Sequence, residues 1–326
     1  NCQWRNPCYE PGFLIPLFQH CRQESVQILA VEAFSDANAA PELWALIPIV
    51  CRPFYRLPFR CAHTWRPDEA FDSTPLLHAE HASAALQGAL EALSVRGVRL
   101  LAMDTVSGDP GFDQLIKTVA QTSGLSIFGR DRFSRAALRP DGTADEYLQG
   151  ILSKNRRKKA RRLRKNLQEM GEVKFEHTLN ASEVQDWALE FVDLEASGWK
   201  GRQGTAIASQ SDSLAFFMEM TQRLAVRQSI RFARLTLDSK PIAMLVDICS
   251  GGHVSAYKTA FDERYSEHSP GFLIELENIR WLHELDCTIC DSCTDPNNEM
   301  INRLYRDRLP FQDLAIGLDK GMNPWV

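Results

Sequence analysis

The sequence of 326 residues lacks any apolar run near the roughly 18 residues that a membrane-spanning helix needs. It also lacks the Gly-x-Ser-x-Gly, Walker and Rossmann glycine patterns. Low-complexity tracts are missing too, and hydrophobic residues make up 44% of the chain, an ordinary fraction for a packed globular protein. These absences exclude a disordered, fibrous or membrane-spanning class, and the length predicts about two domains.

Cysteine is present in an odd number, nine, and most of these residues lie inside apolar runs. Such thiols fit buried, reduced side chains in a cytoplasmic protein better than a disulfide framework. The series Cys287-x-x-Cys290-x-x-Cys293 has no fourth ligand nearby, and a strand would point Cys287 and Cys290 to opposite faces. The pair His78-x-x-His81 stands alone. We therefore expect no metal site.

The formal net charge of −5 hides an uneven distribution of charge. From Lys154 to Lys165 the chain reads KNRRKKARRLRK, with nine basic residues and no acidic one. Apolar residues at helical spacing predict a helix over residues 154–170 that docks by one side. Like charges four residues apart repel each other, so this helix is expected to meet phosphates. Its apolar positions are Ala160, Leu163, Leu167 and Met170.

Four phosphate-bearing partners fit this basic segment: coenzyme A, a nucleotide-linked sugar, tRNA and an anionic membrane surface. Arg157 and Arg161 are the candidate substrate-binding residues. The alternative is a solvated surface helix that acidic residues elsewhere neutralise. The segment contains no aromatic residue, which disfavours binding of single-stranded nucleic acid.

Hydrophobic periodicity predicts a mixed α/β chain. In the first half it predicts strands at 25–34, 42–52, 97–106, 125–129 and 133–138, and helices at 81–95 and 109–123, with another opening near 142–146. In the second half it predicts strands at 173–178, 229–237, 241–249, 253–261, 287–291 and 311–316. The helices expected there are 154–170, 182–197, 213–227, 297–308 and one that follows Pro270-Gly271 and runs to Leu285. Residues 198–204 are expected to form a loop.

This order of elements resembles that of the GNAT superfamily of N-acetyltransferases. The stretch HVSAYKTAFDERYSEHSPGFL at 253–273 resembles its central strand, phosphate-binding turn and helix start, and NEMINRLYRDRLPF at 298–311 resembles its late helix. Together with residues 153–171 and LEASGWKGRQGTA at 194–206, these stretches resemble the CelD/BcsL-type acetyltransferases, two-domain relatives of the FemAB peptidoglycan aminoacyltransferases. The Asn6-Pro7 start and the stretch at 73–77 fit the same group more weakly.

The resemblance implies an α/β (mixed α+β) fold with two GNAT-like domains, at 1–150 and 151–326, each a mixed, largely antiparallel sheet flanked by helices. It implies transfer of an acetyl or other acyl group from acyl-CoA to an amine or hydroxyl acceptor. The relatives' association with cellulose, polysaccharide and envelope synthesis implies a small-molecule or sugar-containing acceptor. A second reading is an aminoacyl-tRNA-dependent transferase, and a third is a non-catalytic anion-binding module on the same fold.

The same resemblance implies where the donor binds. Backbone N–H groups at a bulge near residues 257–259 would face the thioester, and the next helix start would hold the pyrophosphate. Ser266 and Ser269 depart from the superfamily's usual pattern, where Gln or Arg and Gly are expected, and this keeps the tRNA-dependent reading open. The implied donor-binding residues are Tyr257, Lys258, Thr259, Arg264, Ser269, Pro270, Gly271 and Phe272.

N-acyl transfer also needs a base for the amine and a proton for the leaving thiolate. Tyr305 matches the position of the superfamily's general acid. For the base the sequence offers several carboxylates, of which Glu195 and Asp291 are our candidate catalytic residues, and Asp247 and Asp262 remain alternatives. Trp199 and Lys200, in a glycine-flanked segment after Glu195, are candidate substrate-contacting residues.

Overall fold

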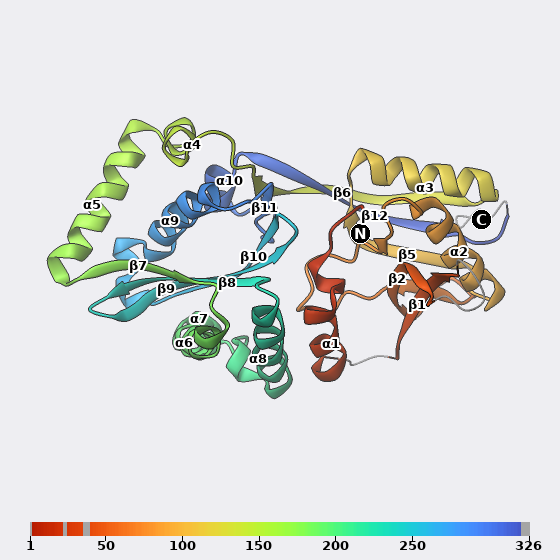
Figure 1. Ribbon diagram of the computed structural model, residues 1–326, viewed down its shortest axis with the longest axis horizontal. Coiled ribbons are helices and arrows are strands. Elements are labelled where there is room, and N and C mark those ends of the chain that lie inside the picture. Colours follow the sequence, from red (N-terminus) through yellow and green to blue (C-terminus); the bar gives the residue numbers. More distant parts are fainter. Residues whose placement is uncertain (1, 22–24, 35–39, 321–326) are drawn as a thin grey trace. The chain divides into compact units, whose positions relative to one another are not determined.

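The computed structural model describes residues 2–21, 25–34 and 40–320 (Figure 1). Its helices are α1 (Pro11–His20), α2 (Ala82–Val95), α3 (Pro110–Ser123), α4 (Ala144–Ile151), α5 (Lys154–Met170), α6 (Ala181–Ser197), α7 (Trp199–Arg202), α8 (Ser211–Val226), α9 (Pro270–Glu284) and α10 (Glu299–Leu304). Short 3-10 helices are η1 (Pro7–Tyr9), η2 (Ile207–Ser209) and η3 (Glu263–His268). The strands are β1 (Val26–Ala33), β2 (Glu42–Cys51), β3 (Cys61–Thr64), β4 (Leu76–Leu77), β5 (Leu100–Ser107), β6 (Ser126–Leu138), β7 (Val173–Thr178), β8 (Ile230–Leu237), β9 (Lys240–Ser250), β10 (His253–Phe261), β11 (Ile289–Asp291) and β12 (Asp307–Gly317).

The chain divides into two compact units. Unit 1 comprises residues 1–14, 22–134 and 309–326, and unit 2 comprises residues 15–21 and 135–308. The chain therefore leaves unit 1 within β6 and returns to it within β12. These bounds differ from the expected division at residue 150, and that division remains a prediction about the two GNAT-like domains.

Unit 1 is built on the strand order β1-β2-β3-β5-β12, with β4 beside β2. Neighbouring strands run antiparallel except β3 and β5, which are parallel and are connected through α2. Helix α2 forms because its apolar residues recur every three or four positions. These residues pack with α3 against the sheet in one large core. The buried residues of α2 are Ala82, Ala85, Leu86, Ala89, Leu90 and Leu93.

Unit 2 has the strand order β11-β10-β9-β8-β7, and the end of β6 pairs with β11. Only β10 and β11 run parallel, and α9 connects them. Helices α6 and α8 cover one face of this sheet, while α9 and α5 lie on the other (Figure 1). Leu163 and Leu167 anchor α5 in the core beneath α9, as the apolar spacing of the basic segment predicts.

The mixed α/β fold with mostly antiparallel pairing and flanking helices is confirmed. The structure corrects several elements. The two short strands expected at 125–129 and 133–138 are one strand, β6, and residues 198–204 contain the one-turn helix α7. The sequence prediction also missed α1, which carries Pro16 in its interior, and the short strands β3 and β4.

The helix expected at 297–308 is shorter than predicted, because α10 ends at Leu304 and β12 begins at Asp307. Asn298 caps its start by accepting a hydrogen bond from the Ile301 N–H. The strand β12 that follows pairs with β5, far away in the sequence, with Phe311 opposite Ser107. A local sequence pattern does not contain this pairing.

Candidate active site

A cavity of about 580 Å³ in unit 2 lies where α9 begins, beside the end of β10 and against α5 and α10. Three cations line it, together with several apolar side chains, a combination that suits a ligand with both phosphate groups and an apolar chain. The cations are Arg156, Lys159 and Arg303, and the apolar residues are Phe261, Pro270, Phe272, Met300 and Leu304. The remaining lining residues are Thr259, Ser266, Ser269, Gly271 and Glu299.

The first turn of α9 opens into this cavity. Ser269 occupies the N-cap position in the left-handed conformation, with φ of 50°, and its side chain makes no capping hydrogen bond among the described residues. Its carbonyl accepts the N–H groups of Phe272 and Leu273. Gly271 lies close to Phe261, since a Cβ at this position would stand 3.4 Å from the phenyl ring. A helix start with this geometry attracts anions through its N–H groups and dipole.

Strand β10 carries a bulge. It pairs with β9 on both sides of Tyr257, but the register shifts between Ala256 and Lys258, so Tyr257 is the extra residue. Pairing with β11 ends at Ser255, whereas pairing with β9 continues to Phe261. The bulge lies within residues 257–259, where the resemblance to the GNAT superfamily implies it. The parallel strands β10 and β11 stop pairing two residues before it, at Ser255.

A second, small cavity of about 40 Å³ adjoins β10. It shares Thr259 and Phe261 with the large cavity, and it is also lined by Glu195, Trp199 and Lys200. Glu195, Trp199 and Lys200, which are expected around the acceptor, thus lie beside β10. The large cavity, whose lining includes residues expected around the donor, adjoins the same strand. The rest of the small cavity is formed by Leu194, Gly198 and Ala260.

Glu195 is 4% exposed, and both oxygens of its carboxyl group have a hydrogen-bond partner. Its Oε1 lies 2.6 Å from the Lys200 Nζ, and its Oε2 accepts the N–H of Ile207 at 2.8 Å. Lys200 itself is about one-quarter exposed, so its ammonium group remains within reach of solvent. A carboxylate buried in this way is held in one orientation toward the cavity.

Helix α7 is fixed by contacts that the sequence pattern does not reveal. The Trp199 N–H donates to Glu263 at 2.9 Å, and Arg202 forms an ion pair with the same carboxylate at 2.6 Å. Only glycine fits at position 201, because a Cβ there would stand 1.8 Å from the Ala196 carbonyl oxygen. The Trp199 side chain remains 48% exposed at the rim of the small cavity.

Five expected binding residues line neither cavity. Tyr257 and Lys258 lie at the bulge of β10, where the Lys258 ammonium stands 5.2 Å from the centre of the Tyr257 ring. Arg264 is paired with Asp262 through several hydrogen bonds, and these lower the pKa of the Asp262 carboxyl. Arg157 donates to the carbonyls of Gln149 and Leu152, so it caps the end of α4. Arg161 is exposed and lines neither cavity.

Sequence reasoning missed Arg156, Lys159 and Arg303, the three cations that do line the large cavity. A signal for two of them was present. The apolar residues Ala160 and Leu163 define the docked side of α5, and Arg156 and Lys159 precede them by one turn on that side. Their position on the helix therefore distinguishes them from Arg161.

Tyr305 is 1% exposed and does not line the cavity, although its neighbour Leu304 does. Its hydroxyl lies 3.4 Å from Glu275 and accepts the Cys290 thiol at 3.8 Å. Burial raises the pKa of the phenol well above its usual value, and burial together with the charge of Asp247 raises the pKa of Glu275 to about 8. This geometry gives no support to the expected role of Tyr305, which remains a prediction.

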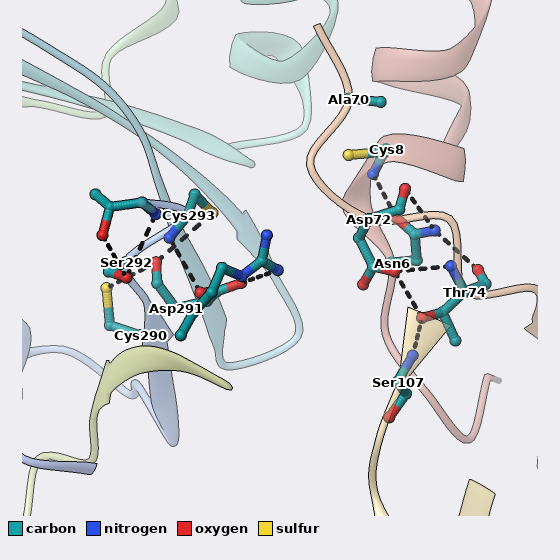
Figure 2. A network of polar contacts seen from close by, with 12 residues as sticks. Asn6, Cys8, Ala70, Asp72, Thr74, Ser107, Cys290, Asp291, Ser292 and Cys293 are labelled. Carbon is teal, nitrogen blue, oxygen red and sulfur yellow. Dashed lines mark hydrogen bonds and ion pairs between the residues drawn. The ribbon is translucent and has the colours of Figure 1, made fainter. Parts of the chain in front are cut away.

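Asp291 forms a buried ion pair with Arg135, at 2.6 Å between Oδ2 and Nη2 (Figure 2). Its other oxygen accepts the N–H of Cys293 at 3.0 Å. Both side chains are buried, and Asp291 lines neither cavity of unit 2. Its contacts are those of a structural pair that fixes the end of β11 against β6.

The two weaker stretches of resemblance near the N-terminus meet in unit 1 (Figure 2). The Asn6 amide donates to the Thr74 carbonyl at 2.8 Å, across 68 positions of sequence. The Thr74 hydroxyl donates to Asp72 and accepts the Ser107 N–H. This network ties the chain start to the loop before β4 and to β5.

Three further observations concern metal-binding groups, cysteines and membrane-spanning helices. The described part of the chain contains no group of three or more His, Cys, Asp or Glu placed to hold a metal ion. None of the nine cysteines, all within the described residues, forms a disulfide bond. Among residues 2–21, 25–34 and 40–320 no helix is long and apolar enough to cross a membrane.

Comparison with known proteins finds one matching family model, over part of the chain. Residues 154–299 match the family described as acetyltransferase (GNAT) domain. No curated protein sequence matches the chain. Solved structures with similar folds include FemX, at 10% identity and a TM-score of 0.61, covering 98% of this chain and 94% of that one.

Two further structures resemble this chain. A conserved protein of unknown function from Bacteroides thetaiotaomicron has 10% identity and a TM-score of 0.57, covering 97% of this chain and 92% of that one. The C-terminal domain of a lysylphosphatidylglycerol synthetase from Agrobacterium fabrum has 15% identity and a TM-score of 0.52, covering 88% and 83%. At these identities the likeness shows a shared fold alone. Residues 154–299 match a GNAT acetyltransferase domain, which supports an N-acyltransferase enzyme, and the chain has a FemX-like fold.

Proposed function

We propose that this enzyme transfers an acyl group, most simply acetyl, from acyl-CoA to an amine acceptor across strand β10. The observation that carries the proposal is that two cavities share Thr259 and Phe261. The large cavity, with cations, apolar walls and a helix start, suits the donor. The small cavity, with a buried carboxylate, suits the amine.

The large cavity offers complementary chemistry for coenzyme A. The N–H of Gly271, the dipole of α9 and the charges of Arg156, Lys159 and Arg303 attract its phosphates. The apolar side chains, among them Phe272 and Met300, suit its pantetheine arm. Ser269, Pro270 and Gly271 form the turn in this arrangement, which supports the role expected from their resemblance.

The reaction needs a base on the acceptor side, and we assign it to Glu195. The amine nitrogen bonds to the thioester carbon, the carbon–sulfur bond breaks, and Glu195 takes the proton that the amine loses. Backbone N–H groups of β10 near the bulge at Tyr257–Thr259 stabilise the oxyanion that forms in between. The departing thiolate is protonated from solvent.

Lys200 has a defined part in this scheme. Its ammonium occupies Glu195 at 2.6 Å, so the acceptor amine must displace it to reach the carboxylate. Lys200 therefore acts as a substrate-contacting residue that vacates the site, and Trp199 contacts the acceptor at the rim. We keep a sugar-containing or envelope-precursor acceptor, and a cytoplasmic location, as the CelD/BcsL resemblance implies.

Calorimetric titration with acetyl-CoA tests the donor site. The wild-type chain should bind one molecule of acetyl-CoA. The variant Gly271→Glu, which adds a negative charge at the start of α9, should bind at least about tenfold more weakly. Gly150→Glu on α4 is the matched control, because a Cβ there has nothing within 4 Å. Absence of binding at millimolar acetyl-CoA would contradict the proposal.

A second candidate donor is aminoacyl-tRNA, and one observation favours it. The side chains of six cations of α5 make no hydrogen bond or ion pair within the described residues, and a cationic surface of this kind binds nucleic acid phosphates. Retention of aminoacyl-tRNA in a filter assay, with steep salt dependence and no binding of acetyl-CoA, would favour this donor. The six residues are Lys154, Arg156, Lys158, Lys159, Arg161 and Arg162.

A further inference from the structure

Unit 1 repeats the local order of strands and helices that surrounds the large cavity of unit 2, which we assign to the donor and call the donor cavity. In unit 2, α9 connects the parallel strands β10 and β11, and α10 follows. In unit 1, α2 connects the parallel strands β3 and β5, and α3 follows. The two segments therefore share the order strand, helix, parallel strand, helix.

A cavity of about 450 Å³ lies at the corresponding place in unit 1. It is bounded by the start of α2, from His81 to Ala84, and by the first turns of α3, from Gly111 to Thr118. The donor cavity is likewise bounded by the start of α9 and by α10. The volume lies within the range typical of small-molecule sites. The other lining residues are Gln3, Trp4, Ala79 and Glu80.

The chemistry of this lining differs from that of the donor cavity. Among its described residues there is no Lys or Arg, and the only carboxylate is Glu80. Such a site disfavours the phosphates of coenzyme A. The lining instead offers two amide side chains, two hydroxyls, one imidazole and one indole. These residues are Gln3, Gln114, Ser83, Thr118, His81 and Trp4.

Several of these groups are held in place by neighbours. The Trp4 ring packs edge-on against Phe112, with centroids 5.1 Å apart, and its N–H points to Asp109 at 3.4 Å. The His81 ring stacks on Trp44 at 4.1 Å. The Gln114 amide nitrogen donates to the Thr118 hydroxyl at 3.1 Å, and the Gln114 side-chain oxygen is an additional acceptor.

The start of α2 adds hydrogen-bond donors. Asp109 caps α3 by accepting the N–H groups of Gly111 and Phe112. In contrast, His81 makes no side-chain cap on α2, and the first turn of α2 contains no acidic residue. The N–H groups of Ser83 and Ala84, two residues that line the cavity, therefore have no side-chain acceptor among the described residues.

We propose that this cavity in unit 1 binds an uncharged saccharide. A flat indole suits the apolar face of a sugar ring, and amides, hydroxyls and backbone N–H groups suit its hydroxyls. The absence of cations separates this ligand class from the donor. The proposal stands independently of the donor assignment, because it rests on residues of unit 1 alone.

Saturation-transfer NMR with N-acetyl-D-glucosamine and with cellobiose tests the site. Both probes should give transfer signals with the wild-type chain at millimolar concentration. The variant Gln114→Leu should reduce the signal at least about fivefold. Gln87→Leu is the matched control, because Gln87 makes the same type of i,i+4 contact, to Glu91, on the exposed side of α2.

The outcomes separate the two proposals. Signals that survive Gly271→Glu but disappear with Gln114→Leu would support a saccharide site in unit 1. No signal with either sugar, or signals that Gln114→Leu leaves unchanged, would overturn it. Binding of two acetyl-CoA molecules per chain, with the second lost in Gln114→Leu, would also overturn it while leaving the donor assignment intact.

Discussion

The ammonium of Lys200 lies 2.6 Å from the carboxylate of Glu195, although the carboxylate itself is almost completely buried. The two residues are five positions apart, at the end of α6 and in α7. Their pairing places an amine against a buried carboxylate beside Thr259. This residue belongs to β10, the strand that also bounds the large cavity. The protein's own side chain therefore occupies the place that we assign to the acceptor amine.

Replacing Glu195 with Gln should lower kcat/KM by about 10²- to 10⁴-fold, because the acceptor amine would lose its base. Gln can still accept the Ile207 N–H, so the fold should persist. Steady-state kinetics with acetyl-CoA and an amine acceptor measure the effect. Glu176→Gln, on β7 and outside both cavities, should change kcat/KM less than about twofold. Equal activity of Glu195→Gln and the wild type would refute the assignment.

The double variant Arg156→Ala with Lys159→Ala should raise KM for acetyl-CoA by about tenfold or more, because two phosphate-attracting charges are lost from the large cavity. The control Arg161→Ala with Arg162→Ala removes two charges from the same helix outside the cavity, so its KM should match that of the wild type. The comparison depends on position rather than on net charge. A similar rise in KM for both variants would indicate only a long-range charge effect.

Tyr305→Phe should leave kcat within about threefold of the wild type, because the hydroxyl is enclosed with Glu275 and Cys290 and does not line the cavity. A general acid in contact with the leaving group would instead lose about 10²-fold or more on this change. The pH profile of kcat provides the second readout. A large fall in kcat together with loss of an alkaline limb would restore the catalytic role that the resemblance implies.

Glu275→Gln should make stability less sensitive to alkaline pH. The pKa of Glu275 is raised to about 8 in the folded chain, chiefly by burial, against about 4.3 for an unperturbed Glu. Its folded form therefore keeps a proton that the unfolded chain releases, and the stability that it contributes is lost as pH rises from about 4.3 through 8. Gln mimics the protonated side chain and should remove this loss.

Urea unfolding at pH 5.5, 7 and 8.5 measures the effect. Over this range the free energy of unfolding should fall by several kcal/mol more for the wild type than for Glu275→Gln. The difference between the two chains isolates this residue from the other titrating groups. Parallel pH dependences would show that Glu275 is ionised in the folded chain.

Asp291→Asn should destabilise the chain by about 3–5 kcal/mol, because it leaves the buried guanidinium of Arg135 without its counter-charge. Chemical unfolding measures the loss. The double variant Arg135→Met with Asp291→Leu should recover much of it, since it removes both charges. Glu169→Gln breaks an exposed pair with Lys165 and should cost less than about 1 kcal/mol. A loss that small for Asp291→Asn would contradict a structural role.

Most elements of unit 2 were predictable because their signals are local. The apolar spacing in α5, the turns between β8, β9 and β10, and the Pro270-Gly271 helix start are each visible within about ten residues. The end of α10 and the length of β6 were not predictable in this way. Both depend on pairing with strands far away in the sequence, such as Phe311 opposite Ser107.

The candidate site shows the same division. Glu195, Trp199 and Lys200 were chosen as candidate site residues from a short glycine-flanked stretch, and all three line the small cavity. Arg157 and Arg161 were chosen by charge alone, whereas the direction in which α5 docks brings Arg156 and Lys159 to the cavity. Residue type was therefore a poor guide where nine cations compete within one helix.

The sequence by itself determined the alternation of strands and helices and the basic helix with its docked side, because these follow from local periodicity. The position of the bulge in β10 came from the resemblance to the GNAT superfamily. Only the tertiary structure decided which cations face the cavity, that Tyr305 and Asp291 are enclosed by partners, and that unit 1 carries a cavity of different chemistry. Packing and strand pairing join residues that are far apart in sequence, and no local pattern encodes which side chains they bury.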